Sequence, residues 1–384
     1  MFVVLKRVVI MQVLIVISTV SAFAQQSRKI DSIIKANRLT IYKNPDETIR
    51  IGDSIYEASK SSGDKVRGLI LISNAYSSKR DYQQALKYCL RADSISKKLD
   101  EPNLKANLLN SIAVIYQQLK VYDKAMEYLD ENDRYMDNHP VQDSIYLRAT
   151  NNVVRGLIYK EDLSCELAIP FFNKAIEQYK KLNTANEQPN ISITLYNRAY
   201  CFLALERYEE AKESFELSIV YAENTNAKSL KAFSLKGLSE VYTHEEEYQK
   251  AINVLDEALL LAEDVGDLIL NRGIYSALAD NYLSVNNWEK YQEYRKLFLE
   301  NQNVIKESER RSISDSIDEL TANYAQKTAQ LTNRYYIYTG VIILLILLTV
   351  FVVLRYHKKA KKSLNNLKLR FEEVKKARKG MGIL

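Results

Sequence analysis

The sequence of 384 residues is poor in the residues that form tight turns. It contains 10 Gly and 5 Pro, whereas a fold built from many short strands needs both residues at its turns. This composition excludes an all-β fold with many turns and favours long helices. The chain has one Trp but 27 Tyr, so the fold has to accommodate an unusual number of phenol rings.

Residues that carry chemistry are also scarce. The three His residues are His139, His244 and His357, and none of them lies beside a group with which it would form a base and nucleophile pair. His244 precedes three Glu residues, which could hold a metal loosely, but the spacing fits no known site and favours a solvated loop. We therefore expect a protein that is not an enzyme and that holds no cofactor or metal.

The three Cys residues, Cys89, Cys165 and Cys201, are far apart in the sequence. An odd number without short spacings indicates neither a disulfide framework nor a zinc site. Free cysteine is commonly buried as a small apolar residue. We interpret all three as core residues of helices, and one pair could still oxidise in a periplasm.

A helical hairpin is repeated six times along the sequence. The first residue type to reveal it is an alanine near the start of each second helix, at Ala85, Ala125, Ala168, Ala211 and Ala251, with Tyr291 in the sixth place. The successive spacings are 40, 43, 43, 40 and 40 residues. A small residue precedes each of these positions by twelve residues, as Ser73, Ala113, Gly156, Ala199, Ser239 and Ala279. Small residues let two helices approach closely.

Two aromatic columns accompany the alanines. The first precedes them by nine residues, as Tyr76, Tyr116, Tyr159, Phe202, Tyr242 and Tyr282, and is expected to fill the space between one hairpin and the next. The second precedes them by three, as Tyr82, Tyr122, Tyr208, Tyr248 and Trp288, and Cys165 interrupts it. In these columns the chain resembles the tetratricopeptide repeat family, whose usual period is 34 residues.

The chain departs from that family's pattern because its tryptophan and its closing proline are absent. Without the proline the second helix can continue, and six to nine additional residues would lengthen each helix by about one turn. The resemblance implies an all-α fold, a long-helix tetratricopeptide-like solenoid of helical hairpins. It covers residues 65–300 as six repeats, and residues 25–64 are interpreted as an N-terminal helical half-repeat or cap.

In this family the first helices of the hairpins line a concave binding surface. Applied to this chain, the groove is expected to be polar at one end, aromatic in the middle and charged at the far end. The expected lining residues are Arg67, Asn74, Asn107, Asn110, Gln117 and Gln118, then Tyr196 and Tyr200, then Lys236, Glu240 and Asp280. Amides and tyrosine rings suit a protein or peptide partner. Each of these residues, taken singly, could instead be ordinary solvated helix surface.

Both ends of the chain resemble targeting segments. Lys6 and Arg7 precede an apolar run and the small residues Ala22 and Ala24, so residues 1–24 are expected to be a signal peptide, or alternatively an uncleaved anchor. Residues 336–354 are expected to be a transmembrane helix, because their charge-free part spans roughly 27 Å against a hydrocarbon core of about 30 Å. The basic residues that follow place residues 355–384 in the cytoplasm and the repeats in the periplasm, with the chain anchored in a bacterial inner membrane.

The net charge of +6 belongs to this tail. Residues 355–384 contain 11 Lys or Arg and 2 Glu, whereas residues 25–354 have a net charge of −5. Nothing therefore indicates a repeat domain that binds nucleic acid.

A polar helical stalk, residues 301–335, is expected between the repeats and the membrane. It has the heptad spacing of a weak coiled coil at Ile313, Ile317, Leu320, Tyr324 and Leu331, and the tail repeats that spacing at Leu364, Leu367, Phe371 and Val374. Helices on both sides of the membrane could pair in a homodimer, or the stalk could be monomeric.

The order of these segments resembles the sensor half of membrane regulators in Bacteroidetes-type bacteria, here without an output domain. We predict a membrane-anchored periplasmic repeat module that binds a protein or peptide and is the input part of a transmembrane signalling system. The alternative is a structural scaffold or assembly factor for an envelope complex.

Overall fold

The computed structural model describes residues 30, 32–34, 41, 44–182, 184–263 and 267–380, with the backbone alone at 185, 263, 308–309, 311–327 and 377–380. The expected signal peptide lies outside the described residues, as do most side chains of the expected stalk heptads. Within these ranges every regular element is a helix. The chain divides into two compact units, one up to Lys306 and one from Glu307 onwards.

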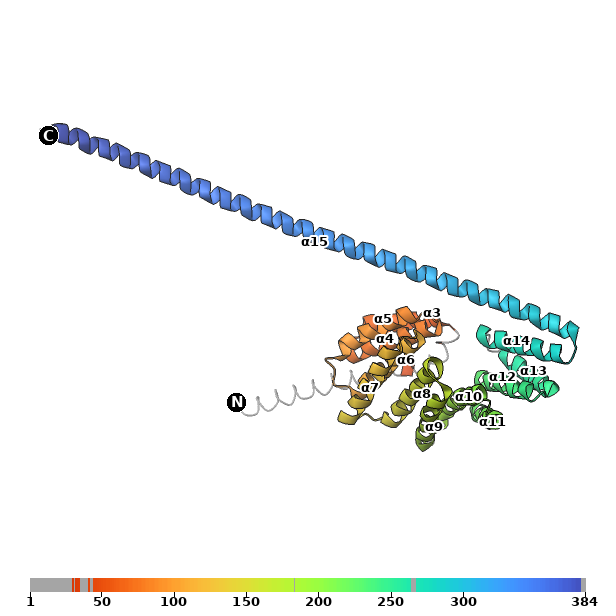
Figure 1. Cartoon of the computed structure of the whole chain (residues 1–384). Helices are drawn as coiled ribbons and strands as arrows, with labels where there is room; N and C mark the ends of the chain where they lie inside the picture. The colour runs from red at the N-terminus through yellow and green to blue at the C-terminus, as the bar shows by residue number, and fades with distance from the viewer. Residues whose placement is uncertain are drawn as a thin grey trace, which may run out of the picture. The chain divides into compact units, whose positions relative to one another are not determined.

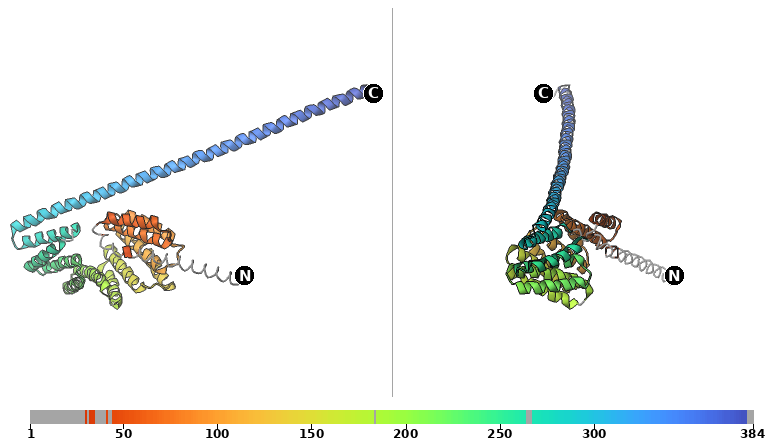
Figure 2. Two further views of the ribbon diagram at one scale, coloured as in Figure 1. Left: turned by 180° about the vertical axis from the view of Figure 1, so that it is seen from behind. Right: turned by 90° about the vertical axis from the view of Figure 1, so that its right-hand side faces the viewer.

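The first unit is a row of antiparallel helical hairpins, which confirms the expected solenoid (Figures 1 and 2). The helix α3 (Pro45–Ala58) lies immediately before the hairpins and packs on the first of them. The hairpins are α4 (Ser62–Ser78) with α5 (Tyr82–Ser96), α6 (Pro102–Gln118) with α7 (Tyr122–Asn138), α8 (Ser144–Asp162) with α9 (Cys165–Leu182), α10 (Gln188–Ala204) with α11 (Tyr208–Glu223), and α12 (Lys228–His244) with α13 (Tyr248–Glu263). A short 3-10 turn, η1 (Ala185–Glu187), precedes α10, and α14 (Leu268–Ser284) leads into α15 (Trp288–Gly380).

Side-chain caps fix where several of these helices begin. The Asn44 side chain accepts a hydrogen bond from the backbone N–H of Glu47 at 3.2 Å, and Asp81 does the same for Gln84 at 3.1 Å. Such caps satisfy N–H groups that have no partner inside the helix. Pro lies in the first turn of α3, α6 and α10, where its missing N–H costs nothing.

The alanine and small-residue columns form the core, as the sequence predicts. The five alanines that mark the second helices are fully buried, and so are four of the small residues twelve positions earlier. At Gly156 a methyl group would lie 2.5 Å from the ring of Phe172. The absence of a side chain at Gly156 therefore allows α8 to approach α9 until its backbone contacts the Phe172 ring.

The first aromatic column also packs within its own hairpin, which was not predicted. Its rings stack on a residue of the same hairpin, three positions after the alanine: Tyr76 on Tyr88, Tyr116 on Tyr128, Tyr159 on Phe171 and Tyr282 on Tyr294, with ring centroids 4.9 to 5.6 Å apart. Both positions lie six residues from the start of the second helix, so an antiparallel hairpin brings them side by side. The rings hold the two helices of one hairpin together as well as filling the space beside the next.

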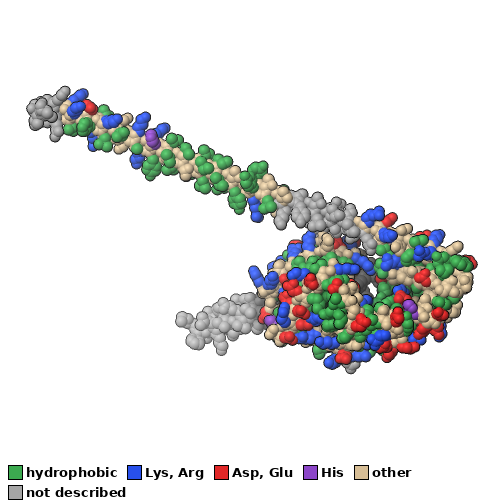
Figure 3. All heavy atoms as spheres, in the orientation of Figure 1, with side chains coloured by type: hydrophobic (Ala, Val, Ile, Leu, Met, Phe, Trp, Pro, Cys, Tyr) green, Lys and Arg blue, Asp and Glu red, His purple; other side chains and the backbone are tan. Residues whose placement is uncertain are grey.

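The second unit consists of the remaining part of α15. It contains one stretch, within Thr328–Lys376, that is long and apolar enough to cross a membrane by length and composition, with a mean hydropathy of 3.0. Its apolar side chains are exposed from Ile337 to Leu354. Figure 3 shows hydrophobic side chains around this part of the helix, followed towards the C-terminus by Lys and Arg.

Candidate binding groove

The expected polar end of the groove is largely occupied by contacts within the protein. Arg67 forms ion pairs with Glu101 at 2.7 Å and with Asp64 at 3.4 Å. Asn107 donates a hydrogen bond to the backbone oxygen of Asn103 at 2.7 Å. These side chains are half-buried, so their polar groups stabilise the first two hairpins.

Gln117 differs from its neighbours on the same expected surface. It is 3% exposed, and its amide contacts Gln118 at 2.7 Å and Glu161 at 3.4 Å. Gln117 therefore offers no surface to a ligand, because it lies where α6 packs on α8. Asn74 and Gln118 are exposed.

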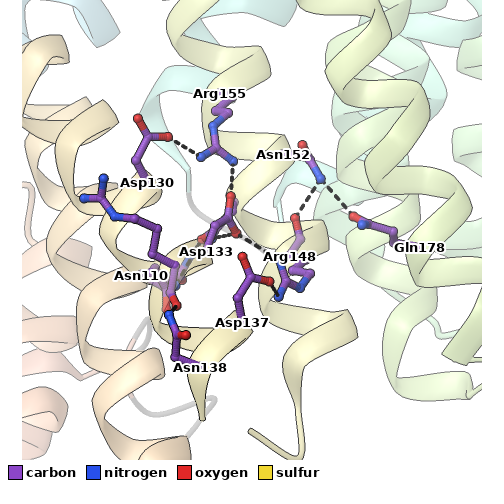
Figure 4. A network of polar contacts seen from close by, with 12 residues as sticks. Asn110, Asp130, Asp133, Asp137, Asn138, Arg148, Asn152, Arg155 and Gln178 are labelled. Atoms are coloured by element: carbon purple, nitrogen blue, oxygen red, sulfur yellow. Dashed lines mark hydrogen bonds and ion pairs between the residues drawn. The ribbon is translucent and has the colours of Figure 1, made fainter. Parts of the chain in front are cut away.

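Asn110 belongs to a polar network between α6, α7 and α8 (Figure 4). It is 8% exposed and donates to Asn151 at 2.9 Å, which in turn donates to Asp133 at 2.9 Å. Arg155 lies between Asp130 and Asp133, at 2.7 and 2.8 Å. The Asn110 amide thus stabilises the junction between hairpins and does not line the groove.

The other end of the expected groove is hollowed into a charged pocket of about 380 Å³. Residues of α12, α14 and α15 line it: Lys236, Glu240, Thr243, His244, Arg272, Gly273, Ser276, Ala277, Asp280, Asn281 and Phe298. Lys236, Glu240 and Asp280, predicted from the sequence, are thereby brought together. Partial burial raises the pKa of the Asp280 carboxyl.

An apolar pocket of about 300 Å³ lies between α10 and α12. It is lined by Ser192, Ile193, Tyr196, Leu230, Phe233 and Ser234. The Tyr196 and Phe233 rings meet edge to face with centroids 5.8 Å apart, and Ile193 is 37% exposed. The pocket therefore offers an apolar side chain a place where it can leave water.

Tyr200 connects the two pockets. Its hydroxyl donates to Glu240 at 3.2 Å and accepts from Lys236 at 3.2 Å, while Lys236 and Glu240 form an ion pair with each other. Its ring contacts Tyr196 edge to face at 5.0 Å. Burial, and then the neighbouring Glu240 carboxylate, raise the pKa of Tyr200 well above its usual value, so the hydroxyl stays protonated.

Apart from Tyr196, the lining of the apolar pocket was not predicted from the sequence, nor was part of the lining of the charged pocket. Ile193, Phe233 and Gly273 lie eighteen residues before the alanine of the second helix, or before Tyr291 in the last hairpin. Arg67 and Asn107 occupy the same place in the first two hairpins. Following that column through all hairpins would have identified them. Phe298 could not be found in this way, because it lies on α15 and not on a first helix.

Among the residues that the structure describes, no three His, Cys, Asp or Glu side chains gather as a metal site requires. The side chains that line the two pockets can form apolar contacts and hydrogen bonds with a ligand. Their mixture of apolar and charged linings resembles a recognition surface.

Sequence models of the tetratricopeptide repeat family match residues 66–99, 106–131, 193–225 and 234–269. These segments coincide with the first, second, fourth and fifth hairpins.

Two curated proteins are similar in sequence. The Tonsoku-like protein of Drosophila melanogaster is 26% identical over 211 residues, which are 55% of this chain and 14% of that protein. Regulatory protein RapK of Bacillus subtilis is 28% identical over 166 residues, 43% of this chain and 39% of RapK. The chain therefore spans less than half the length of either relative.

Two solved structures have a similar fold. A Rap protein complexed with Competence and Sporulation Factor has a TM-score of 0.51 at 16% identity, covering 67% of this chain and 80% of that one. NprR in complex with its cognate peptide NprX also has a TM-score of 0.51 at 16% identity, covering 72% and 77%. Because the family models match four of the hairpins, and these hairpins have the buried columns described above, the chain contains repeats of the tetratricopeptide family.

Proposed function

We propose that this protein binds a peptide, or an extended segment of a partner protein, across the apolar and charged pockets. The observation that carries the proposal is that one helix, α12, contributes side chains to both pockets. α12 contributes Leu230 and Phe233 to the apolar pocket and, one turn further on, Lys236 and Glu240 to the charged pocket. A peptide with an apolar side chain next to a charged group would satisfy both.

The tyrosines between the pockets support this reading. Tyr196 and Tyr200 are held by edge-to-face contacts with Phe215, at 6.4 and 5.2 Å, so little entropy is lost when a ligand contacts them. The Rap structure is a complex with Competence and Sporulation Factor, and the NprR structure is a complex with its cognate peptide NprX, as their names state. The fold shared with NprR supports a peptide as the ligand.

The proposal extends to a membrane-anchored sensor with its repeats in the periplasm. The apolar stretch of α15 and the basic residues after it support one span with a cytoplasmic tail. Phe298 supports an input role, because it lines the charged pocket and belongs to the same helix as that stretch. A ligand in the charged pocket would thus contact the element that continues towards the membrane.

A photocrosslinking experiment in cells tests the groove. A benzoylphenylalanine in place of Ser276, in the charged pocket, should give an adduct with one partner that mass spectrometry can identify. The change Ile193→Asp places a charge in the apolar pocket and should reduce the adduct at least tenfold. Leu217→Asp is the matched control, because Leu217 is also 37% exposed but lies on α11, away from both pockets.

The control variant should accumulate to the same level as the wild-type protein and should give the same yield of adduct. Equal adduct yields in the two variants would show that the apolar pocket takes no part in binding. An adduct with a subunit of an envelope complex would favour the scaffold role over the sensor role.

A further inference from the structure

Cys165 occupies an exceptional position in the repeat pattern. Five hairpins have an aromatic residue three positions before the column alanine or its equivalent, and the third hairpin has Cys165 instead. Cys165 is the first residue of α9 and is half-buried. The third hairpin therefore lacks the ring that its neighbours use at this point.

In other hairpins this ring shares an apolar cluster with an aliphatic residue of the next hairpin. Tyr82 shares an apolar cluster with Ile115 of the next hairpin, and Tyr122 shares one with Ile158. Each aliphatic residue lies ten positions before the alanine of its own hairpin. The same pairing of positions, one on the second helix of a hairpin and one on the first helix of the next, thus occurs at both of these junctions.

Cys201 occupies the aliphatic side of this contact in the fourth hairpin, ten residues before Ala211. Cys165 and Cys201 share one apolar cluster, as the aromatic and aliphatic residues do elsewhere. Between the third and fourth hairpins, cysteine thus occupies both of these paired positions. α9 and α10 pack on each other, and the Cys165 thiol, after burial, contributes to the raised pKa of Cys201, which places the two thiols near each other.

The third cysteine has a different environment. Cys89 is fully buried in the first hairpin, and its sulfur lies 3.1 Å from the Ser73 hydroxyl. Burial raises the pKa of Cys89 to about 11. Cys89 therefore provides a natural control for the other two.

We propose that Cys165 and Cys201 form a reversible disulfide that joins α9 to α10. With oxidised glutathione as the oxidant, the more accessible Cys165 attacks as the thiolate, forms a mixed disulfide and releases one glutathione. Cys201 then loses its proton and attacks the Cys165 sulfur, which releases the second glutathione. One sulfur–sulfur bond forms in the protein, the two thiols lose two electrons and two protons, and one disulfide is reduced to two glutathione thiols.

The order of attack follows from the burial of the two groups. Burial, with the Cys165 thiol beside it, raises the pKa of Cys201 far above its usual value, so its thiolate is rarely present. Closure of the bond restricts the unfolded chain between positions 165 and 201. Because α10 also carries Tyr196 and Tyr200, the disulfide would fix the helix that forms the aromatic part of the groove.

The test uses the purified full-length chain in detergent, treated with dithiothreitol or with oxidised glutathione, then denatured and labelled with a maleimide. The reduced protein should take three labels. The oxidised protein should take one label, carry no glutathione, give a Cys165–Cys201 peptide on digestion, and melt several degrees higher than the reduced form. Dithiothreitol should reverse the shift.

Single alanine variants provide the controls. Cys89→Ala should take no label after oxidation, whereas Cys165→Ala and Cys201→Ala should form no internal disulfide. Ala75 occupies the place of Cys201 in the first hairpin, so this position tolerates alanine, and circular dichroism verifies that each variant is folded. Three labels on the oxidised wild type, a bridge that includes Cys89, or glutathione retained on Cys165 beside a free Cys201 would each overturn the proposal.

Discussion

In five of the hairpins, close packing depends on the alanine near the beginning of the second helix. Ala125 is fully buried and shares a cluster with Leu129 of the same helix and with Val154 of the following hairpin. A protein interior is close-packed, so additional methyl groups at this position displace neighbouring side chains.

Ala125→Leu should therefore destabilise the protein by about 1 to 3 kcal/mol through overpacking. The same substitution at Ala204, the exposed last residue of α10, should change the free energy of unfolding by less than about 0.5 kcal/mol. Thermal melting followed by circular dichroism measures both. Equal melting of the two variants would show that the register assigned to the repeats is wrong.

Buried tyrosines should make the protein sensitive to alkaline pH. Burial raises the pKa of Tyr196 to about 12, against about 10 in an unfolded chain. The folded state holds this proton more tightly than the unfolded state, so the protonated hydroxyl contributes fully to stability below about pH 10. As pH rises further this contribution is lost, by at most about 1.4 kcal/mol per pH unit for each such group.

Urea unfolding at pH 9, 10 and 11 tests this dependence. Stability should fall above pH 10, and the fall should be smaller in Tyr196→Phe, which keeps the ring but has no proton to lose. The same pH dependence in both proteins would contradict the assignment to Tyr196.

The turn inside most hairpins has a left-handed residue that is not glycine. Arg80, Lys120, Glu206, Glu246 and Asn286 have φ between 57° and 62°. Each lies just after the end of the first helix, five residues before the alanine of the second helix or, in the last hairpin, before Tyr291. Side chains with a Cβ are strained in this conformation, whereas glycine adopts it readily.

Lys120→Gly should therefore stabilise the protein by roughly 0.5 to 1 kcal/mol, since Lys120 is exposed and has φ 58°. Lys124→Gly, four residues later inside α7, should destabilise it by about 1 kcal/mol. Chemical unfolding of the two variants measures the contrast. A loss of stability in both would show that the Lys120 side chain has an unrecognised stabilising contact.

The sequence was sufficient to predict the hairpins and their buried columns, because both depend on spacing along a helix. It did not indicate which polar residues of the first helices are buried. Asn110 and Tyr196 occupy the same place in their hairpins, fifteen residues before the alanine, yet one belongs to a polar junction and the other lines a pocket. That difference depends on how each hairpin packs on the next, which spacing along one helix does not encode.

At the scale of the whole molecule, the basic residues after the apolar stretch of α15 predict the orientation of the chain. A reporter that is active only in the periplasm should be active when fused after Glu300 and inactive when fused after Lys379. The expected cause is the positive charge of the tail, which resists transfer across the membrane. Activity of the fusions in the reverse order would contradict the proposed topology.

The polar network between the second and third hairpins has a consequence for how the solenoid unfolds. A repeat protein is cooperative to the extent that each unit stabilises its neighbour. Here Arg155 with Asp130 and Asp133, and Arg148 with Asp137 at 2.6 Å, take places where apolar burial would couple the units more strongly, because charged groups lose hydration when they pair. We expect hydrogen exchange to divide the solenoid at this junction into two blocks that open separately, and the division to sharpen as salt screens the pairs.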